Sequence, residues 1–277
     1  MRVGGPARFF ASARSAMELK DALAFARGDG HPVFVLGGGS NVLFPDAGFP
    51  GLVIRLAGSL SRIALDEKAG RISAGGGAPF MRLGRRLAAL GFSDFLFACG
   101  IPGTVGGAVR MNAGTSEGDV SRVLISARVL LPDGSEREMP ASEMEFGYRR
   151  SRLASMPGAV VLSADFSTGR AGDREETLSA MEKSLAARRA REPRVKRNFG
   201  SVFKNPPGSP PAGRLLEEAG MKGARVGGAM VAPEHANWIV NLGNATSADV
   251  LALIRLCEER VFERHGIRLE REVVVPV

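Results

Sequence analysis

The stretch Gly100–Gly114, GIPGTVGGAVRMNAG, holds five glycines and one proline in fifteen residues, and the interpretation of this chain starts from it. Glycine has no Cβ, so its amide can face into a concavity that a side chain would fill. Successive amides that face one point form a nest for an anion such as a diphosphate. The stretch therefore predicts a backbone that approaches a phosphorylated ligand closely.

A second glycine-rich stretch, Leu36–Asn41 (LGGGSN), directly follows the apolar run Val33–Val35. Two such turns, each at the end of a strand, predict one large phosphorylated cofactor held at two places. The competing interpretation is chance clustering among 36 glycines in 277 residues, because short glycine motifs are often only turns. Neither stretch has the spacing of a dinucleotide-binding fold, and no lysine completes a P-loop.

Six motifs occur along the chain in one order: LGGGSNVLF, ACGIPGTVGGAVRMNAG, FGYRRSRL, GSVFKNP, AGRLLEEAGMKG and LEREV. In these motifs and their order the chain resembles the UDP-N-acetylenolpyruvoylglucosamine reductases, the MurB flavoenzymes of peptidoglycan synthesis. The resemblance extends from Val3 to Val275. Six motifs in one order are far more specific than any one of them.

The composition is that of an ordinary globular protein, with 24% charged and 44% hydrophobic residues. No apolar run approaches the roughly 20 residues that cross a bilayer, and the start, MRVGGPARFF, lacks the apolar centre of a signal peptide. Cys99 and Cys257 have no C-x-x-C spacing. We therefore expect a reduced, cytoplasmic protein that does not insert into a membrane.

The chain is basic, with 37 Lys and Arg against 29 Asp and Glu, and its richest run is Arg188–Arg197. Such a run is open to three interpretations: a nucleic-acid patch, a basic helix end beside the helix dipole, or part of a field that attracts anionic small molecules. A single Tyr, a single Trp and no recognised motif argue against nucleic acid. We expect anionic small-molecule ligands and no nucleic-acid partner.

Helices and strands are expected to interleave without a strict βαβ period, which predicts an α+β fold. Ser247 is the expected N-cap of the last helix and Gly266 its stop, and the small polar residues 167–172 mark a candidate boundary. The expected helices are 16–27, 80–90, 173–191 and 247–264, and the expected strands are 33–36, 52–56, 63–74 (a hairpin), 123–131, 160–166, 236–242 and 269–275.

The resemblance implies two lobes of an FAD-binding unit of the vanillyl-alcohol-oxidase-like type, residues 1–57 and 58–168, and an α+β substrate-binding domain, residues 169–277. It implies noncovalent FAD, and none of the three histidines lies in a glycine motif. The chain begins at a point that resembles the inside of the first lobe, which is thus expected to be shortened, and the tail after LEREV is short. The residues assigned to FAD are Gly37, Gly38, Gly39, Ser40, Asn41, Gly100, Ile101, Pro102, Gly103, Thr104, Gly106, Gly107 and Ala108.

The family's reaction takes a hydride from NADPH through the flavin to the enolpyruvyl double bond of a UDP-sugar. Such a site needs a fixed cation where negative charge develops and a group that delivers a proton. The resemblance assigns the cation to Arg149, the proton to Ser201 and a charge-stabilising carboxylate to Glu272. It implies substrate binding by Tyr148, Lys204 and Asn205, and no metal. The forms FGYRRSRL and GSVFKNP resemble the subtype without an extra loop over the substrate.

Taken without the family, each of these residues has a simpler interpretation. Tyr148 and Arg149 read as a surface turn, and Arg150 and Arg152 carry the same charge. Ser201 after Gly200 reads as a turn cap. Glu270 is expected to face the same side as Glu272, and Lys204 reads as a solvated loop lysine.

Two other functions stay open on the residues alone: a flavin oxidase of the same fold that acts on a sugar or alcohol, and a flavin-binding protein without catalysis. An oxidase would share both glycine stretches but would not require the GSVFKNP and LEREV pair. The residues show no pocket for a 2′-phosphate that would separate NADPH from NADH.

Overall fold

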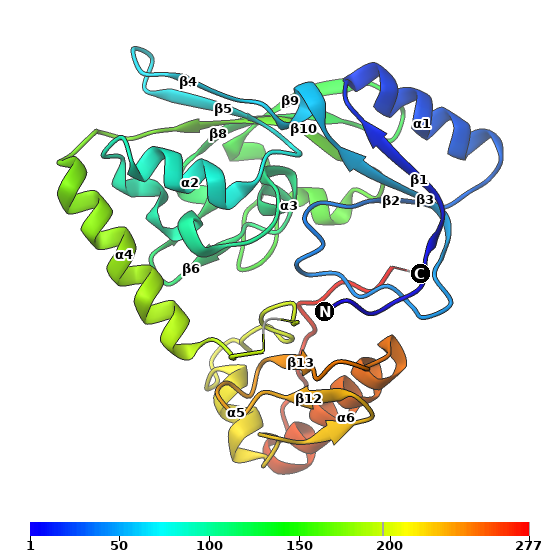
Figure 1. Cartoon of the computed structure of the whole chain (residues 1–277). Helices are drawn as coiled ribbons and strands as arrows, with labels where there is room; N and C mark the ends of the chain where they lie inside the picture. Colours follow the sequence, from blue (N-terminus) through cyan, green and yellow to red (C-terminus); the bar gives the residue numbers. More distant parts are fainter. Residues whose placement is uncertain (196, 277) are drawn as a thin grey trace. The chain divides into compact units, whose positions relative to one another are not determined.

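The computed structural model describes residues 1–195 and 197–276. The chain forms two compact units (Figure 1). We call Phe9–Gly39 with Gly51–Ala187 the large unit, and Met1–Arg8, Ser40–Pro50 and Arg188–Val277 the small unit. Each unit is assembled from segments that are distant in sequence. Lys196, in the basic run, and Val277, at the end of the chain, lie outside the described residues.

The large unit is built on a five-stranded antiparallel sheet in the order β4-β5-β10-β8-β9. Helices α2 and α3 lie on one face of this sheet (Figure 1). The strands are β4 (Ile63–Asp66), β5 (Arg71–Gly75), β8 (Leu124–Leu130), β9 (Glu136–Pro140) and β10 (Val160–Ser167); the helices are α2 (Phe80–Ala88) and α3 (Val105–Arg110). The short strands β6 (Gly114–Thr115) and β7 (Gly118–Asp119) form a separate hairpin.

Strand β10 is the middle strand of this sheet, and side chains on both of its faces are buried. Val161, Ala164 and Phe166 belong to the core formed with α2 and α3. Val160 and Leu162 face the opposite way, into a core shared with α1 and β3. Burial on both faces explains why this strand opens with the continuous apolar run Val160–Leu162, after which apolar and polar residues alternate.

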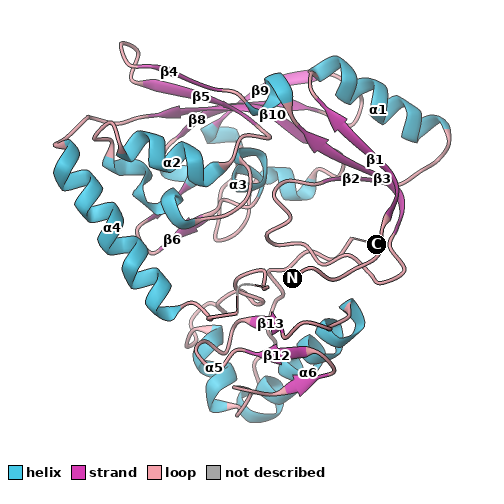
Figure 2. Ribbon diagram, viewed as in Figure 1, coloured by secondary structure: helices cyan, strands magenta, loops and turns pink. Residues whose placement is uncertain are grey.

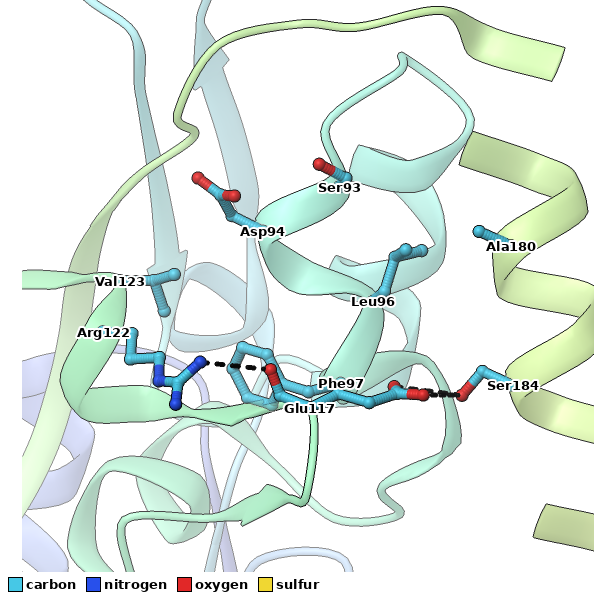
Figure 3. A pocket seen from close by; sticks show the side chains of 9 residues that line it. All are labelled: Ser93, Asp94, Leu96, Phe97, Glu117, Arg122, Val123, Ala180 and Ser184. Carbon is cyan, nitrogen blue, oxygen red and sulfur yellow. Dashed lines mark hydrogen bonds between the residues drawn. The ribbon is translucent and has the colours of Figure 1, made fainter. Parts of the chain in front are cut away.

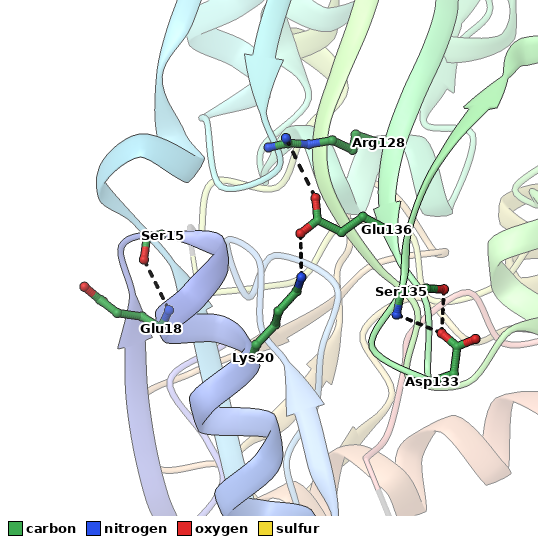
Figure 4. A network of polar contacts seen from close by, with 7 residues as sticks. All are labelled: Ser15, Glu18, Lys20, Arg128, Asp133, Ser135 and Glu136. Carbon is green, nitrogen blue, oxygen red and sulfur yellow. Dashed lines mark hydrogen bonds and ion pairs between the residues drawn. The ribbon is translucent and has the colours of Figure 1, made fainter.

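Strands β1 (Ala7–Ala13), β3 (Phe49–Leu56) and β2 (Val33–Val35) form a three-stranded sheet in the order β1-β3-β2, and β2 is parallel to β3. Helix α1 (Ala16–Gly28) begins at its N-cap Ser15, whose side chain accepts from the amide of Glu18. Lys20 of this helix lies 2.8 Å from the Glu136 carboxylate, which also faces Arg128 at 3.8 Å (Figure 4). This network joins α1 to β9 and β8.

The hairpin between β8 and β9 turns at Pro132-Asp133-Gly134, a sequence typical of turns. Asp133 accepts from both the amide and the hydroxyl of Ser135, at 2.9 and 2.7 Å (Figure 4). These bonds, the hydroxyl bond first, lower the pKa of the Asp133 carboxyl below its ordinary value. Local bonding of this kind is the reason that Asp at this point signals a turn.

The small unit contains a three-stranded sheet, β11 (Arg225–Val226), β12 (Ala229–Val231) and β13 (Ile239–Asn241), and the helices α5 (Ala212–Glu218) and α6 (Ser247–His265) (Figure 2). Its core includes Leu215, Leu253 and Val261 from the two helices. Helix α4 (Arg174–Arg191) begins in the large unit, and its residues from Arg188 onward are counted with the small unit. None of the helices among the described residues has the length and apolar character that crossing a bilayer requires.

The α+β class and most of the expected elements are confirmed, but the end of the chain differs from the prediction. Thr246, not Ser247, is the N-cap of α6, because it forms a capping box with Asp249. Ser247 is the first helical residue, and Gly266 ends the helix with a φ of 68°, as expected. The expected strand 269–275 makes only isolated bridges, because residues 203 and 42 pair with it at different points. The expected strand 236–242 shrinks to β13.

Candidate functional site

The two glycine-rich stretches meet in the large unit. A Cβ on Gly38 would lie 2.8 Å from the Cα of Gly103, and one on Gly37 would lie 2.6 Å from the Oγ1 of Thr104. Strand β2 brings the first stretch to this point, since the Leu36 amide still donates to Ile54 of β3. The second stretch arrives with Gly103 at a φ of 118°, which L-residues with side chains rarely adopt. Side chains would separate these two segments.

A third glycine run, Gly75–Gly77, supports the second stretch from behind. The amides of Gly106 and Val105 donate to the carbonyls of Gly76 and Ala78, at 2.8 and 2.9 Å. A Cβ on Gly76 would lie 1.9 Å from the carbonyl oxygen of Val161, so only glycine fits there. This run is not among the predicted cofactor-binding residues. Its signal is present in the sequence, since GGGAPF directly follows the expected hairpin 63–74.

The amides of the first stretch are available to a ligand. Among the described residues, nothing in the protein accepts a hydrogen bond from the amides of Gly37, Gly38 or Gly39. Gly38 and Gly39 are exposed, and Gly39 has a φ of 65°. Unbonded amides beside a close backbone approach are the features that a diphosphate nest needs. The residues therefore fit a diphosphate-containing cofactor, and Cβ atoms would fill the cradle.

Tyr148 and Arg149 occupy the two central positions of a tight turn. Gly147 and Arg150 exchange backbone hydrogen bonds of 2.9 and 3.1 Å across it. Arg149 has a φ of 54°, and its guanidinium carbon lies 5.1 Å from the ring centre of Tyr148, which is 55% exposed. Arg149 is half-buried and Arg150 exposed. The turn interpretation of this motif is confirmed, and it leaves a role for Arg149 open.

Ser201 and Glu272 lie on neighbouring segments of the small unit. Ser201 pairs with Trp238 on one side, and the next residue accepts from the Glu272 amide at 2.8 Å on the other. The buried Asn237 holds the segment by exchanging two hydrogen bonds with the backbone of Phe203, at 2.9 and 2.8 Å. Within the described part of the chain the Ser201 hydroxyl makes no hydrogen bond, so it does not cap a turn.

Lys204 and Glu270 form an ion pair, with Nζ 2.6 Å from Oε1. The Lys204 side chain is 19% exposed and that of Glu270 is 73% exposed. Asn205 accepts from the amide of Ala212 at 3.0 Å, at the start of α5. Glu270 therefore has a structural partner in Lys204. The predicted residues Ser40 and Asn41 also belong to the small unit, where the Nδ2 of the Asn41 side chain donates to the Glu272 backbone carbonyl at 2.9 Å.

Two family models match this chain. Residues 7–139 match the family described as "FAD binding domain", and residues 192–276 match "UDP-N-acetylenolpyruvoylglucosamine reductase, C-terminal domain". The UDP-N-acetylenolpyruvoylglucosamine reductase 2 of Symbiobacterium thermophilum is 43% identical to this chain. The match covers 99% of this chain and 88% of the relative. The chain belongs to the UDP-N-acetylenolpyruvoylglucosamine reductase family.

Two further members of this reductase family extend the similarity. The enzyme of that name from Heliobacterium modesticaldum is 44% identical, over 99% of this chain and 86% of the relative. The crystal structure of MurB from Thermus caldophilus is similar with a TM-score of 0.83 and 40% identity, and the match covers 99% of this chain and 94% of that one. The family resemblance seen in the six motifs is thus confirmed over nearly the whole chain.

The large unit of this chain also contains a cavity apart from the predicted site. It has a volume of about 460 Å³, and its walls come from the segment after α2, the β6–β7 hairpin and α4 (Figure 3). Three of its polar residues are engaged with one another: the Ser184 hydroxyl donates to the Glu117 carboxylate at 2.8 Å, and Arg122 donates to the Glu117 carbonyl at 3.3 Å. No residue of the predicted site lines it.

The two cysteines of the chain are free and buried. Burial raises the pKa of the Cys99 thiol to about 11 and that of Cys257 to about 12. Both side chains therefore remain protonated at neutral pH, and neither has the thiolate character of a reactive cysteine. This agrees with the sequence analysis, which assigned no role to either residue.

Proposed function

We propose that this chain reduces the enolpyruvyl double bond of UDP-N-acetylglucosamine enolpyruvate to give UDP-N-acetylmuramate, with NADPH as the reductant, in the cytoplasmic synthesis of peptidoglycan precursors. The observation that carries the proposal is the close approach of Gly38 and Gly103. It supports a diphosphate-containing cofactor in a chain of this reductase family. FAD, when bound, supplies hydride transfer between NADPH and the sugar.

The large unit would hold FAD through the amides of the two glycine stretches. Gly37, Gly38 and Gly39 present unbonded amides, and Gly103 allows the backbone segments to approach. These partial positive charges would face the diphosphate. The family model for an FAD-binding domain over residues 7–139 includes both stretches. For the domains we retain the division into 1–57, 58–168 and 169–277 as a proposal; the two family models, over residues 7–139 and 192–276, support only an FAD-binding part followed by a C-terminal part.

Arg149 would bind the carboxylate of the enolpyruvyl group. A guanidinium is planar and permanently charged, and it grips a carboxylate through two parallel hydrogen bonds. Hydride addition to the double bond places negative charge on the carbon beside this carboxylate. A fixed cation there lowers the energy of the charge that develops. The turn that carries Arg149 is closed by two hydrogen bonds, so the side chain starts from a defined backbone.

Ser201 would deliver the proton, from its Oγ to the carbon that does not receive hydride. Its hydroxyl has no competing hydrogen bond among the described residues, and the backbone around it is held by Asn237. Glu272 would stabilise the charge that forms beside this carbon or relay it. Lys204, Asn205 and Tyr148 would contact the UDP-sugar. A formal net charge of +8 favours the approach of three ligands that are all anionic.

The test is to purify the protein, record its visible spectrum and follow NADPH oxidation with and without the enolpyruvyl sugar. We expect a flavin spectrum that NADPH bleaches and that the sugar restores much faster than air does. Rapid return of the spectrum in air, indifferent to the sugar, would favour the oxidase. A folded protein that binds no FAD would overturn the proposal at its first step.

A further inference from the structure

Asn112 ends helix α3 in a left-handed conformation. Its φ is 43°, and the amides of Asn112 and Ala113 donate back to Val109 and Ala108, at 3.3 and 2.9 Å. This is the Schellman arrangement, in which the residue after the helix has a positive φ and is usually glycine, sometimes asparagine. Glycine would be sufficient for the backbone here. The presence of an asparagine therefore directs attention to what its side chain does.

The Asn112 side chain is only 3% exposed, and it bonds at both ends of its amide. Its Nδ2 donates to the carbonyl of Gly147 at 3.0 Å, and its Oδ1 accepts from the Ser121 amide, also at 3.0 Å. Gly147 is the first residue of the turn that contains Arg149. The bond therefore joins the end of the glycine-bearing helix to the start of that turn.

A second bond fastens the other end of the same turn to α3. The hydroxyl of Ser151, a residue that is 2% exposed, donates to the carbonyl of Arg110 at 2.7 Å. The turn between these two anchors places Arg149 at a φ of 54°, a region that few residues with a Cβ adopt. Such a conformation persists only where the surroundings enforce it. The two anchors from α3 provide that enforcement.

We propose that Asn112 is a positioning residue that holds the Arg149 turn at a fixed place relative to the glycine cradle. Helix α3 starts inside the second glycine stretch, and the turn is attached to the end of the same helix. The cradle and the arginine thus belong to one continuous hydrogen-bonded segment of the large unit. The inference rests on the proposed function, because Asn112 would act through Arg149, the residue proposed to bind the substrate carboxylate.

Two variants separate the side chain from the helix cap. Asn112→Gly keeps the left-handed backbone and removes both side-chain bonds, whereas Asn112→Asp keeps the acceptor for Ser121 and replaces the donor to Gly147 with a carboxylate oxygen. We expect both variants to retain FAD and its spectrum and to be reduced by NADPH at close to the wild-type rate. Calorimetric titration should show the enolpyruvyl sugar bound about tenfold more weakly, as expected for loss of a buried hydrogen bond.

A double-mutant cycle tests whether Asn112 acts through Arg149. In an Arg149→Ala background, Asn112→Gly should cause no further loss of sugar affinity, because the side chain that it positions is gone. An equal further loss in that background would overturn the role. So would wild-type affinity in both single variants. A wild-type protein that binds FAD but not the sugar would instead overturn the proposed function, and the positioning role with it.

Asn241 supplies the matched control. It is a buried asparagine of the small unit whose Nδ2 donates to the Met1 carbonyl at 3.0 Å and whose Oδ1 accepts from Gly243 at 2.8 Å. Asn241→Asp should lower the midpoint of thermal unfolding without changing sugar affinity. If it weakens sugar binding as much as Asn112→Asp does, the effect is general loosening of the fold and the positioning role is wrong.

Discussion

The amide of Gly106 donates to the carbonyl of Gly76 over 2.8 Å, and a Cβ on Gly76 would lie 1.9 Å from the carbonyl oxygen of Val161. One glycine therefore fits between the central strand β10 and the start of helix α3. This contact explains how a helix with two glycines in six residues keeps a fixed place on the sheet. The chain thus has two kinds of glycine: those proposed to face a ligand, and those that maintain the fold. Substitutions at the two kinds are expected to have different effects.

Gly38 is proposed to be a glycine of the first kind, and Gly38→Ala adds a single methyl group at its contact with Gly103. Because the added Cβ would push the two cradle segments apart, we expect the affinity for FAD to fall by at least about tenfold. A tenfold loss corresponds to about 1.4 kcal/mol of binding free energy. Fluorescence titration of the apoprotein with FAD measures this. Gly28→Ala is the control, since a Cβ there meets nothing within 4 Å. Equal FAD affinity in both variants would remove Gly38 from the cofactor site.

Gly76→Ala tests a glycine of the second kind. The new methyl group meets backbone atoms of β10, which cannot move away as the end of a side chain can. We expect the free energy of unfolding to fall by about 1–3 kcal/mol, as for overpacked cores. Denaturant unfolding of the apoprotein, without FAD, measures this separately from cofactor binding. Wild-type stability of the variant would show that the sheet and α3 are not packed as described.

Ser201→Ala distinguishes a proton donor from a structural serine. Because the hydroxyl has no hydrogen bond among the described residues, we expect unfolding free energy to change by less than about 0.5 kcal/mol. Reduction of the flavin by NADPH should be nearly unchanged, and reoxidation by the enolpyruvyl sugar should slow by roughly 100-fold, the contribution of a positioned acid. Stopped-flow absorbance resolves the two half-reactions. Equal slowing of both would indicate damaged cofactor placement instead.

Glu270→Gln and Glu272→Gln form a matched pair two positions apart. Glu270 is 73% exposed and pairs with Lys204, so its loss should change stability by no more than about 1 kcal/mol, as for other surface ion pairs. Glu272→Gln should slow reoxidation by the sugar at least about tenfold, if its carboxyl group holds or relays a proton beside the carbon where negative charge develops. Steady-state kcat and KM for the sugar in both variants decide the matter. A larger loss of kcat in Glu270→Gln would reverse the assignment.

The buried thiols give a pH-dependent prediction. With pKa values of about 11 for Cys99 and about 12 for Cys257, both stay protonated in the folded protein at pH 8. In the unfolded chain a thiol has its ordinary pKa, so as pH rises past about 8.5 the unfolded state loses these protons first and the thiol contribution to stability declines. A chromogenic disulfide reagent should react slowly with native protein at pH 8 and rapidly after denaturation. Fast labelling of the native protein would contradict the burial of the thiols.

Local hydrogen bonding and residue periodicity account for what could be read directly from the chain. The helices α1, α4 and α6 and the hairpins of β4–β5 and β8–β9 each depend on residues a few positions apart, and their signals are visible in one short window. The error at Ser247 was of the same local kind: Thr246 and Asp249 already formed a capping box in the sequence. The ordered motifs also indicated the family, which the comparisons confirmed.

Contacts between distant residues could not be read in this way. Gly38 meets Gly103, Gly76 fits against Val161, and Asn112 bonds to Gly147 because the strands and helices between them bring these positions together. Whether a glycine faces a ligand or a carbonyl oxygen depends on its neighbours in space. The amino-acid order thus specified the local elements and the chemistry available at each position. The tertiary structure decided which of those groups meet. Hydrogen bonds and steric exclusion act only over a few ångströms, so they depend on distance in space and not on the number of residues between two positions.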